Sequence, residues 1–540
     1  MKIHYVSVIG IVVSSLALVL GLGACGSDEP DPTATTAPTP TTVAPTPEAT
    51  ATGMMAEPTP EATATGMMAE PTPEATATGM MAEPTPAATT PTTTTAAPAP
   101  TETGALTPDD AVVLAQYAAD HAGGPGAIFV GDPTHLIGPP PHEGLMFQVP
   151  EALYTQLSTV ALVGSPELGI PGHMFIYDSD YYVELIQKAN LTNPTELTSS
   201  GESIEIQHTC IDRNLPTCVL IQSYWAPNLA KRTNGQVNLS VVSFVELGLS
   251  GPETLDQVSS GTLDMVNIYT GYVAGVLPAL EIQSLWGMSS DWESTYSIVT
   301  DLYPDIDRMI LEATEGSHVL NRNWFAGSDQ WFFGNKPLVT LEDFQGVKIR
   351  SHGAAMSDFI TGMGGEPVFL DVAEVYTALE RGNVDASANS ALLAVPDRLF
   401  EVADYMSGPV IGFGYTNNVI NKDVWDSIPT DLQQIIIEEG AKAELEALRL
   451  APFQNIVAVQ LNQQLGLQYE LFSEEITNHI HTVVMPEHVI PGWLRRLGYP
   501  GRNADVVALA NDKLAPYMGL FIAEDGSIEQ VPITKGSRAQ

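Results

Sequence analysis

Residues 346–389 read GVKIRSHGAAMSDFITGMGGEPVFLDVAEVYTALERGNVDASAN, and this stretch carries the clearest signal of the fold class. Its apolar pattern predicts a strand at 347–350, a helix that ends at Gly364 and Gly365, and a second strand at 367–370. Two short strands joined by a helix form a βαβ unit, in which the strands run parallel. The segment therefore indicates an α/β protein.

The same stretch continues with a predicted helix over 373–381, stopped by Gly382, and a strand that delivers Asn389. In open α/β sheets, ligands bind at the carboxyl ends of strands, where this unit places Arg350 and Asn389. A guanidinium matches a carboxylate with two parallel hydrogen bonds. Arg350 is therefore a candidate for binding an anionic ligand; the alternative is a surface ion pair with a neighbouring Asp or Glu.

Five stretches of the chain form an ordered set of motifs. They are RTNGQVNL (232–239), ETLDQVSSGTLDMV (253–266), GVKIR (346–350), EVYTALERGNVDASAN (374–389) and VINKDVWDSIPTDLQ (419–433). Together they resemble the DctP-type solute-binding subunit of tripartite ATP-independent periplasmic (TRAP) transporters, from about residue 202 onward. The resemblance implies a two-lobed α/β fold of the periplasmic-binding-protein type (type II-like) with a long inter-lobe helix. The helical pattern at 429–464 fits that helix, with a kink expected at Pro452.

These features divide the chain into five parts. We expect a lipoprotein signal peptide at 1–24, a disordered repeat linker at 25–104, an unassigned small α/β segment at 105–201, the solute-binding domain at 202–530 and a tail at 531–540. Within the domain, lobe I is expected at about 202–324 and 411–445, and lobe II at about 325–410 and 446–530. A strand is also expected at 279–285.

The predicted ligand-binding residues are Arg350, Asn389, Gln330, Trp331, Trp286 and Tyr376. The neutral donors of Asn389 and Gln330 suit a hydroxyl or keto oxygen, and the aromatic-rich stretch 324–336 suits either an apolar ligand body or inter-lobe packing. Where relatives that bind acidic sugars have a second arginine, this chain has Asp329 and Gln330, an arrangement similar to that of oxo-acid binders. We therefore expect a monocarboxylate rather than a dicarboxylate or sialic acid.

The charge of the chain excludes some partners. Among 540 residues, 64 are Asp or Glu and 21 are Lys or Arg, which gives a net charge of −43. Such a field repels nucleic acid and anionic lipid headgroups. The sequence predicts no cofactor; a bound Na⁺ or other cation is compatible with it but nothing indicates one.

The N-terminus combines the basic Lys2, an apolar run at 6–22 and a lone Cys25 that follows small residues. This pattern resembles a bacterial lipoprotein signal, in which Cys25 becomes the lipidated N-terminus. A transmembrane anchor is the alternative, since the run is nearly long enough to span a bilayer. Either reading places the rest of the chain outside the cytoplasm, and lipidation would attach it to the cell membrane.

Two segments precede the recognised region. Three copies of PTPEATATGMMAE, starting at residues 45, 58 and 71, lack the apolar residues of a core and predict a disordered tether. In 105–201 we expect a helix that begins at Thr107 and strands at 127–130 and 174–177. The residues His135, His142 and Glu143 are too loosely spaced to predict a metal site over an ordinary loop.

Cys210 and Cys218 are the only cysteines besides Cys25. Outside the cytoplasm an even pair close in sequence predicts a disulfide. A zinc site with His208 is the minor alternative, because it lacks a fourth ligand.

The sequence thus predicts an extracytoplasmic solute-binding lipoprotein. It would capture a small organic acid and pass it to the membrane subunits of a TRAP transporter. No nucleophile with an adjacent base, Walker loop or HExxH motif is present, so we do not expect an enzyme. The alternatives are a substrate-binding protein of an ATP-driven importer or sensor, and a wall-tethered hydrolase.

Overall fold

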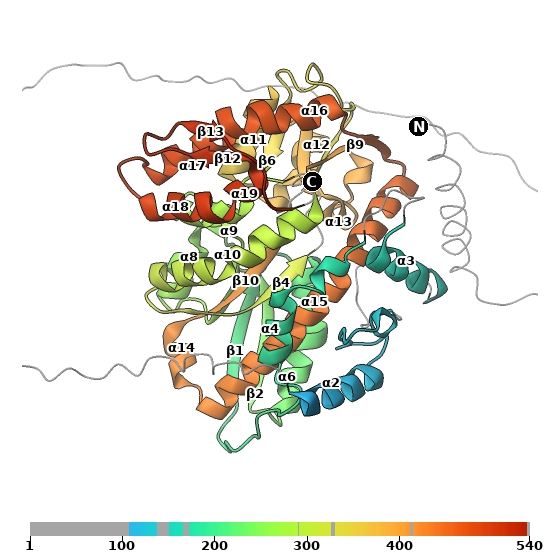
Figure 1. Ribbon diagram of the computed structural model, residues 1–540, viewed down its shortest axis with the longest axis vertical. Coiled ribbons are helices and arrows are strands. Elements are labelled where there is room, and N and C mark those ends of the chain that lie inside the picture. The colour runs from blue at the N-terminus through green and yellow to red at the C-terminus, as the bar shows by residue number, and fades with distance from the viewer. Residues whose placement is uncertain are drawn as a thin grey trace, which may run out of the picture. The chain divides into compact units, whose positions relative to one another are not determined.

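The computed structural model describes residues 107–137, 151–165, 172–289, 291–325, 330–410 and 414–536 (Figure 1). Residues 103–540 fall within one compact unit. The predicted signal peptide, Cys25, the repeat linker, His142, Glu143 and Asp329 lie outside the described residues. Among the helices of the described ranges, none is both long enough and apolar enough to cross a membrane.

Lobe I is built on a five-stranded sheet in the order β2-β1-β3-β10-β4. The strands are β1 (Ile204–Cys210), β2 (Val237–Ser243), β3 (Met265–Ile268), β4 (His318–Phe325) and β10 (Gly414–Ile420). β1 runs parallel to β2 and β3, while β10 runs antiparallel to β3 and β4. Its helices are α5 (Pro216–Leu220), η3 (Ile221–Trp225), α6 (Ala226–Arg232), α7 (Phe244–Leu247), η4 (Gly251–Glu253), α8 (Thr254–Ser259), α9 (Thr270–Val273), η5 (Pro278–Ser284), α10 (Trp292–Ala313) and α14 (Lys422–Ser427).

Lobe II is built on a six-stranded sheet in the order β11-β9-β5-β8-β6-β7. The strands are β5 (Gln330–Gly334), β6 (Lys348–Ser351), β7 (Glu366–Phe369), β8 (Ala386–Ser390), β9 (Tyr405–Val410) and β11 (Gln468–Leu471). β6 lies between β7 and β8 and is parallel to both, which confirms the predicted βαβ unit. Its helices are α11 (Ala354–Met363), η6 (Val372–Glu374), α12 (Val375–Glu380), α13 (Ala391–Ala394) and η7 (Leu399–Glu401).

The C-terminal part of the chain adds further helices and a two-stranded sheet. These are α16 (Glu474–His479), η8 (Ile480–Val489), α17 (Ile490–Leu497), α18 (Ala504–Lys513), α19 (Ala515–Met518), β12 (Leu520–Ile522) and β13 (Ile528–Gln530). This part contacts both lobes: η8 packs on α11, and Lys513 Nζ lies 2.9 Å from Asp305 Oδ2 in α10.

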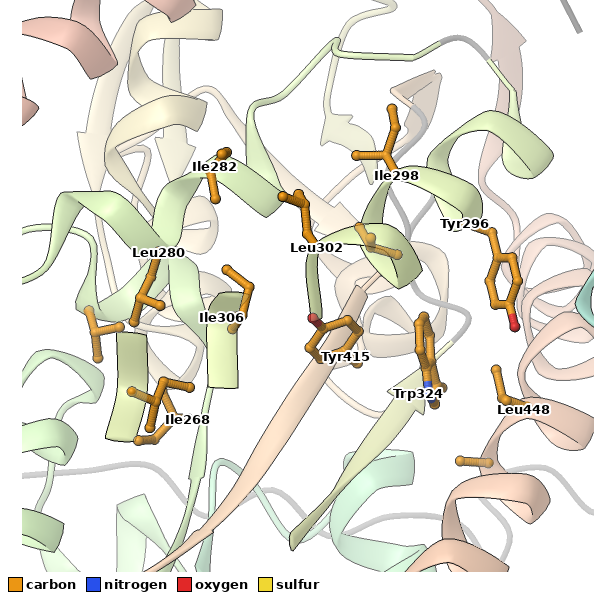
Figure 2. Packing of buried hydrophobic residues seen from close by; sticks show 14 of the residues in the cluster. Ile268, Leu280, Ile282, Tyr296, Ile298, Leu302, Ile306, Trp324, Tyr415 and Leu448 are labelled. Carbon is orange, nitrogen blue, oxygen red and sulfur yellow. The ribbon is translucent and has the colours of Figure 1, made fainter. Parts of the chain in front are cut away.

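The core of lobe I forms where α10 covers the sheet. Figure 2 shows Leu302 and Ile306 of α10 with Ile268 of β3 and Tyr415 of β10, all buried. Burying an aliphatic side chain of this size contributes about 1.5–3 kcal/mol. The predicted strand at 279–285 is wrong, because Pro278 starts a 3₁₀ turn there, η5, in which Leu280 N donates to Leu277 O at 3.1 Å.

One helix connects the two lobes, as predicted. α15 (Thr430–Gln464) is a 35-residue helix, about 50 Å long at 1.5 Å per residue. Its first half packs on lobe I, where Asn321 Nδ2 of β4 donates to Gly440 O at 2.9 Å. Its second half packs on lobe II, where Asn462 Nδ2 donates to Ala391 O at 2.8 Å. Pro452 lies inside the helix, which continues through it.

The segment before lobe I is helical in its described residues rather than α/β. Its elements are α2 (Pro108–Asp120), η1 (Pro133–Leu136), α3 (Glu151–Val163), η2 (Met174–Ile176) and α4 (Asp180–Lys188). Thr107 caps α2 in a capping box, which confirms the predicted helix start. The strands predicted at 127–130 and 174–177 are wrong. Side chains satisfy the backbone at the first, where Phe129 N donates to the Tyr182 hydroxyl at 3.0 Å, and a 3₁₀ turn forms at the second.

The described residues of this N-terminal segment (107–137, 151–165 and 172–199) pack along α15, chiefly through α3 and α4 (Figure 1). It supplies hydrogen-bond donors to buried carboxylates of that helix. Glu438 accepts from Asn190 Nδ2 at 2.7 Å, and Glu446 accepts from the Gly126 amide at 3.2 Å. Glu444 accepts from the Tyr181 hydroxyl. Because a buried carboxylate without donors is costly, the segment is an integral part of the folded unit.

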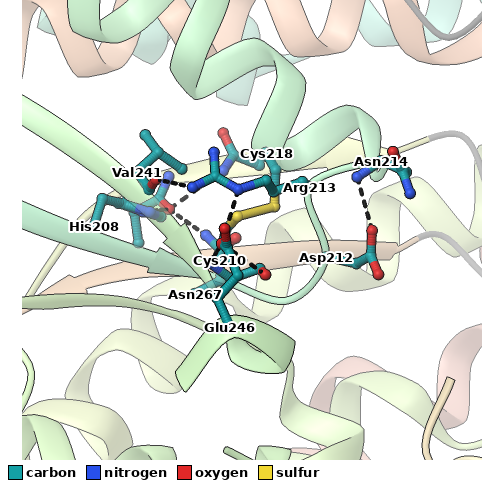
Figure 3. The surroundings of a disulfide bond; sticks show 12 residues. His208, Cys210, Asp212, Arg213, Asn214, Cys218, Val241, Glu246 and Asn267 are labelled. Atoms are coloured by element: carbon teal, nitrogen blue, oxygen red, sulfur yellow. Dashed lines mark hydrogen bonds and ion pairs between the residues drawn. A yellow bond between two sulfur atoms is a disulfide. The ribbon is translucent and has the colours of Figure 1, made fainter. Parts of the chain in front are cut away.

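The structure joins Cys210 and Cys218 in a disulfide, with the two Cα atoms 5.7 Å apart, which is the pairing that the sequence predicts. Figure 3 shows Arg213 in the loop between them. Its Nε donates to Glu246 at 2.8 Å and its Nη2 to Val241 O at 2.7 Å. The disulfide and these contacts hold the loop at the carboxyl end of β1.

Candidate functional site

Arg350 lies at the carboxyl end of β6, and its side chain is 2% exposed. Its Nε donates to Leu370 O at 3.0 Å, and its Nη1 donates to Ala388 O at 2.9 Å and to Asn389 Oδ1 at 2.6 Å. These acceptors follow from the topology, because β7 and β8 flank β6 and run parallel to it. The structure thus brings together the predicted residues Arg350 and Asn389.

The acceptors of Arg350 are all neutral. Among the described residues, no carboxylate lies within 4.0 Å of its guanidinium. Burial lowers the pKa of the guanidinium, and Tyr272, Asp397 and Asp371 oppose that effect. An arginine in a protein stays protonated nonetheless. The surface ion pair considered from the sequence is absent from the described part of the chain.

Of the two side-chain polar atoms of Asn389, one is hydrogen-bonded within the protein and the other is not. Its side chain is 1% exposed, and its Oδ1 accepts from Arg350 and, at 3.2 Å, from the hydroxyl of Ser387. Its Nδ2 is buried and has no hydrogen-bond partner in the structure. A buried donor of this kind is unusual in a folded protein and suits an acceptor atom on a ligand.

Gln330 begins β5, which runs antiparallel to β8, so that its side chain is at the same sheet edge as Asn389. Its Oε1 lies 3.3 Å from His352 Nε2. The ring of His352 packs edge-on against Trp286 of lobe I, with 5.4 Å between centroids. The structure therefore brings Gln330 and Trp286 to one cluster, with His352 between them.

Lobe I adds two tyrosines to this cluster. Tyr269 follows β3 directly, and its ring lies 6.0 Å from that of His352 and 5.2 Å from that of Tyr272. Burial raises the pKa of Tyr272, and the Arg350 guanidinium opposes the rise. Burial, and to a lesser extent the positive charge of Arg350, lowers the pKa of His352 to about 3. His352 is therefore neutral at physiological pH.

Asp397 is the acidic group of the site with the largest pKa shift. Burial, together with Asp212 of lobe I, raises its pKa to about 7, against the opposing effect of Arg350. Its Oδ2 is buried without a hydrogen-bond partner. Arg350 thus lies in the field of this carboxyl group without pairing with it.

The other two predicted residues lie in different surroundings. Trp331 pairs with Asn389 across β5 and β8, and its ring packs on Tyr469 with 5.1 Å between centroids. Tyr376 donates its hydroxyl to Glu401 Oε2 at 3.1 Å in an exposed position of α12. Among the described residues, no hydrogen bond or ring contact joins Tyr376 to Arg350, and the role of Tyr376 as a ligand contact stays a prediction.

Sequence reasoning missed His352, Tyr269, Tyr272 and Asp397. Two of these residues, His352 and Tyr269, could have been found from their positions in the sequence. His352 follows Arg350 by two positions and so points to the same side of its strand, and Tyr269 sits at the carboxyl end of β3, as Arg350 does at that of β6. Within the described ranges, no group of three or more His, Cys, Asp or Glu side chains is arranged to hold a metal ion.

Comparison with known proteins gives consistent matches. The model of the family described as "Bacterial extracellular solute-binding protein, family 7" (DctP) matches residues 217–489, a little over half of the chain. A solute-binding protein of Albidiferax ferrireducens is 28% identical over 249 residues, which are 45% of this chain and 71% of that protein. The 2,3-diketo-L-gulonate-binding periplasmic protein YiaO of Escherichia coli is 26% identical over 216 residues, 40% of this chain and 65% of that protein.

Solved structures share the fold. The structure of a Bordetella pertussis extracytoplasmic solute receptor binding pyroglutamic acid superposes with a TM-score of 0.52 at 19% identity, covering 58% of this chain and 99% of that chain. A TRAP periplasmic solute-binding protein from Desulfovibrio salexigens with bound orotic acid gives a TM-score of 0.51 at 19% identity, covering 58% and 98%. These likenesses establish the two-lobed binding-protein fold, and the N-terminal segment lies outside the family match, which begins at residue 217.

Proposed function

Because the chain belongs to the bacterial extracellular solute-binding protein family 7, the DctP type of TRAP solute-binding subunit, we propose that it captures a small organic monocarboxylate and delivers it to the membrane subunits of a TRAP transporter. Members of this family are extracytoplasmic receptors rather than enzymes. The ligand and the delivery step are our proposal for this chain.

The observation that carries the proposal is Arg350. It is a buried cation held by three neutral acceptors, with no carboxylate of the described residues within 4.0 Å. A buried charge is stable only when it is paired. A ligand carboxylate would complete the pairing, and each charge-assisted hydrogen bond would contribute about 1.5–3 kcal/mol.

The neighbours of Arg350 favour a single carboxylate. Asn389 Nδ2 is a neutral donor suited to a hydroxyl or keto oxygen, and Trp286 and Tyr269 offer apolar faces. A second carboxylate would meet Asp397 and Asp371, which act on Arg350 from nearby. Repulsion and desolvation would oppose its entry.

Capture would proceed by closure of the two lobes. Arg350 and Asn389 belong to lobe II, whereas Trp286 and Tyr269 belong to lobe I. A ligand that contacts both sets binds the closed state more tightly than the open one, and the population shifts accordingly. The closed form would be the one that the membrane subunits recognise.

We also propose that lipidated Cys25 attaches the protein to the cell membrane and that the repeat linker 25–104 acts as a flexible tether. The support is the sequence pattern around Cys25 and the composition of the repeats.

Calorimetry with the full chain tests the ligand class. We expect pyruvate, 2-oxobutyrate or lactate to bind more tightly than succinate or sialic acid. Arg350→Lys should weaken binding tenfold or more, because an ammonium cannot reproduce the two-pronged contact. Arg381→Lys, at an exposed position, is the matched control and should bind as the wild type does. Tight succinate binding, or wild-type affinity of Arg350→Lys, would contradict the proposal.

A further inference from the structure

One short turn carries both the predicted ligand arginine and a series of contacts to the opposite lobe. Residues 350–355 connect β6 to α11 in lobe II. Arg350 is the proposed contact for the ligand carboxylate. His352, two residues later, packs on Trp286 and Tyr269 of lobe I, at 5.4 and 6.0 Å between ring centroids.

The backbone of this turn also approaches lobe I closely. A β-carbon added to Gly353 would lie 3.1 Å from Gly271 O in α9, which is tighter than ordinary van der Waals contact. The φ angle of Gly353 is −175°, an extended conformation open to any residue. Because the nearest atom is a backbone oxygen, a larger residue at position 353 would push the turn and α9 apart in this arrangement of the lobes.

The next contact is a buried carboxylate. Glu281 lies on η5 of lobe I and is 1% exposed. Its Oε1 accepts from the amide of Ala355, in the first turn of α11, at 2.6 Å. Its Oε2 accepts from Arg496 Nε of α17 at 2.9 Å, and Arg496 Nη1 donates to Asp358 of α11 at 2.6 Å. The amides at a helix N-terminus favour a negative charge.

A second bond joins the same elements. Trp493, also on α17, donates its Nε1 to Pro278 O of η5 at 2.8 Å. α17 contacts both η5 of lobe I and α11 of lobe II. If the lobes separated, Glu281 would lose the hydrogen bond that it accepts from the Ala355 amide. The contact thus favours the closed state.

We propose that Glu281 is a latch residue: it touches no ligand, but it sets the affinity by stabilising the closed arrangement through the α11 N-terminus that directly follows Arg350. The turn 350–355 then links the two events. Carboxylate binding fixes Arg350 at one end of the turn, and lobe closure fixes Ala355 at the other. This inference rests on the proposed binding function.

The test measures closure directly in the full chain. Spectroscopic labels on non-canonical residues at Val245 of lobe I and Leu471 of lobe II, both exposed, leave the cysteines untouched. The inter-lobe distance is recorded without ligand and with millimolar pyruvate. Glu281→Gln should shift the open-to-closed ratio toward open by fivefold or more, and should weaken pyruvate binding by a similar factor. Glu312→Gln, at a carboxylate that is 63% exposed on α10, is the matched control.

The distance distribution of the Glu281→Gln variant decides whether Glu281 stabilises the closed state. A wild-type distance distribution in Glu281→Gln overturns the latch. If that variant does not fold, Ala355→Pro takes its place, since proline lacks the amide hydrogen that Glu281 accepts; an unchanged distribution in that variant also overturns the proposal. If wild type binds no monocarboxylate, the proposed ligand class fails, but the ligand-free distances still show whether Glu281 holds the lobes together.

Discussion

Asn389 Oδ1 lies 2.6 Å from Arg350 Nη1, and this hydrogen bond fixes which way the amide of Asn389 points. The oxygen must face the guanidinium, because two donors cannot face each other. The Nδ2 group is consequently presented on the other side, where it has no partner. The pair therefore has one charged donor and one neutral donor in a fixed arrangement, which is what the proposed monocarboxylate site needs.

Asn389→Asp should remove the neutral donor while keeping the shape of the side chain. The new carboxylate would pair with Arg350 and compete with the ligand carboxylate, so we expect affinity for a monocarboxylate to fall at least tenfold. The thermal unfolding midpoint should stay level or rise, since a buried cation gains a partner. Asn383→Asp, at an exposed position, controls for added charge. Unchanged affinity in Asn389→Asp would mean that Arg350 does not bind the ligand carboxylate.

Asp397 should make stability depend on pH. Its pKa is about 7 in the folded protein, whereas an aspartate in an unfolded chain titrates near 3.9. Between about pH 4 and pH 7 the folded state holds a proton that the unfolded state has released, so stability falls as pH rises through this window. Asp397→Asn should therefore gain stability relative to wild type between about pH 4 and pH 8 in urea titrations.

The exposed Asp404 provides the control for that experiment. The free energy of unfolding of Asp404→Asn should differ from that of the wild type by the same small amount at about pH 4 and at about pH 8. If Asp397→Asn behaves in the same way, the raised pKa of Asp397 is wrong.

Tyr181→Phe should destabilise the protein by about 1–3 kcal/mol, the cost of removing a donor from a buried polar group. The tyrosine hydroxyl donates to Glu444, which is fully buried and also accepts from Trp324 Nε1 at 2.9 Å. Tyr376→Phe is the matched control, because its hydroxyl bonds an acid in an exposed position. Equal urea midpoints for the two variants would mean that the N-terminal segment packs only loosely on α15.

Replacing both Cys210 and Cys218 with serine should cost about 2–3 kcal/mol, from the loop entropy restored to the unfolded chain. Peptide mapping without reduction should recover the two residues in one cross-linked fragment. Finding two free thiols in the native protein would contradict the disulfide. The alternative of a zinc site with His208 would then have to be tested.

Cys25→Ala should release the protein from the membrane fraction, because lipidation requires that thiol. Membrane attachment that survives the substitution would indicate an uncleaved apolar anchor at residues 6–22. Deletion of residues 26–104 should leave ligand affinity unchanged in either case, since a tether contributes reach rather than contacts.

The sequence could predict that Arg350 and Asn389 lie together in lobe II, because the signal is local. Strand ends, glycine stops and the polar residues beside them lie within one βαβ unit, and the rule about carboxyl ends of strands then identifies Arg350 and Asn389. The latch residue Glu281 had no such signal. It meets Ala355 74 residues further along the chain, and an isolated glutamate in the sequence does not reveal whether it will be buried.

The wrong strands have a related cause. Residues 127–130 are apolar enough for a strand, but a strand also needs a neighbour to take its backbone hydrogen bonds, and the Tyr182 hydroxyl serves Phe129 instead. The sequence specifies apolar character, whereas the tertiary neighbour decides between strand and loop. The same limit applies to η5, where Pro278 favours a turn.

The hydrogen bonds between the N-terminal segment and α15 bear on how the chain folds over time. Tyr181 and Glu444 are separated by 263 residues, and Gly126 and Glu446 by 320. The carboxylates of the connecting helix thus meet donors that were synthesised hundreds of residues earlier. Contacts of such high sequence separation slow folding, because loop closure must precede the gain. We therefore expect the N-terminal segment to dock on α15 late in folding.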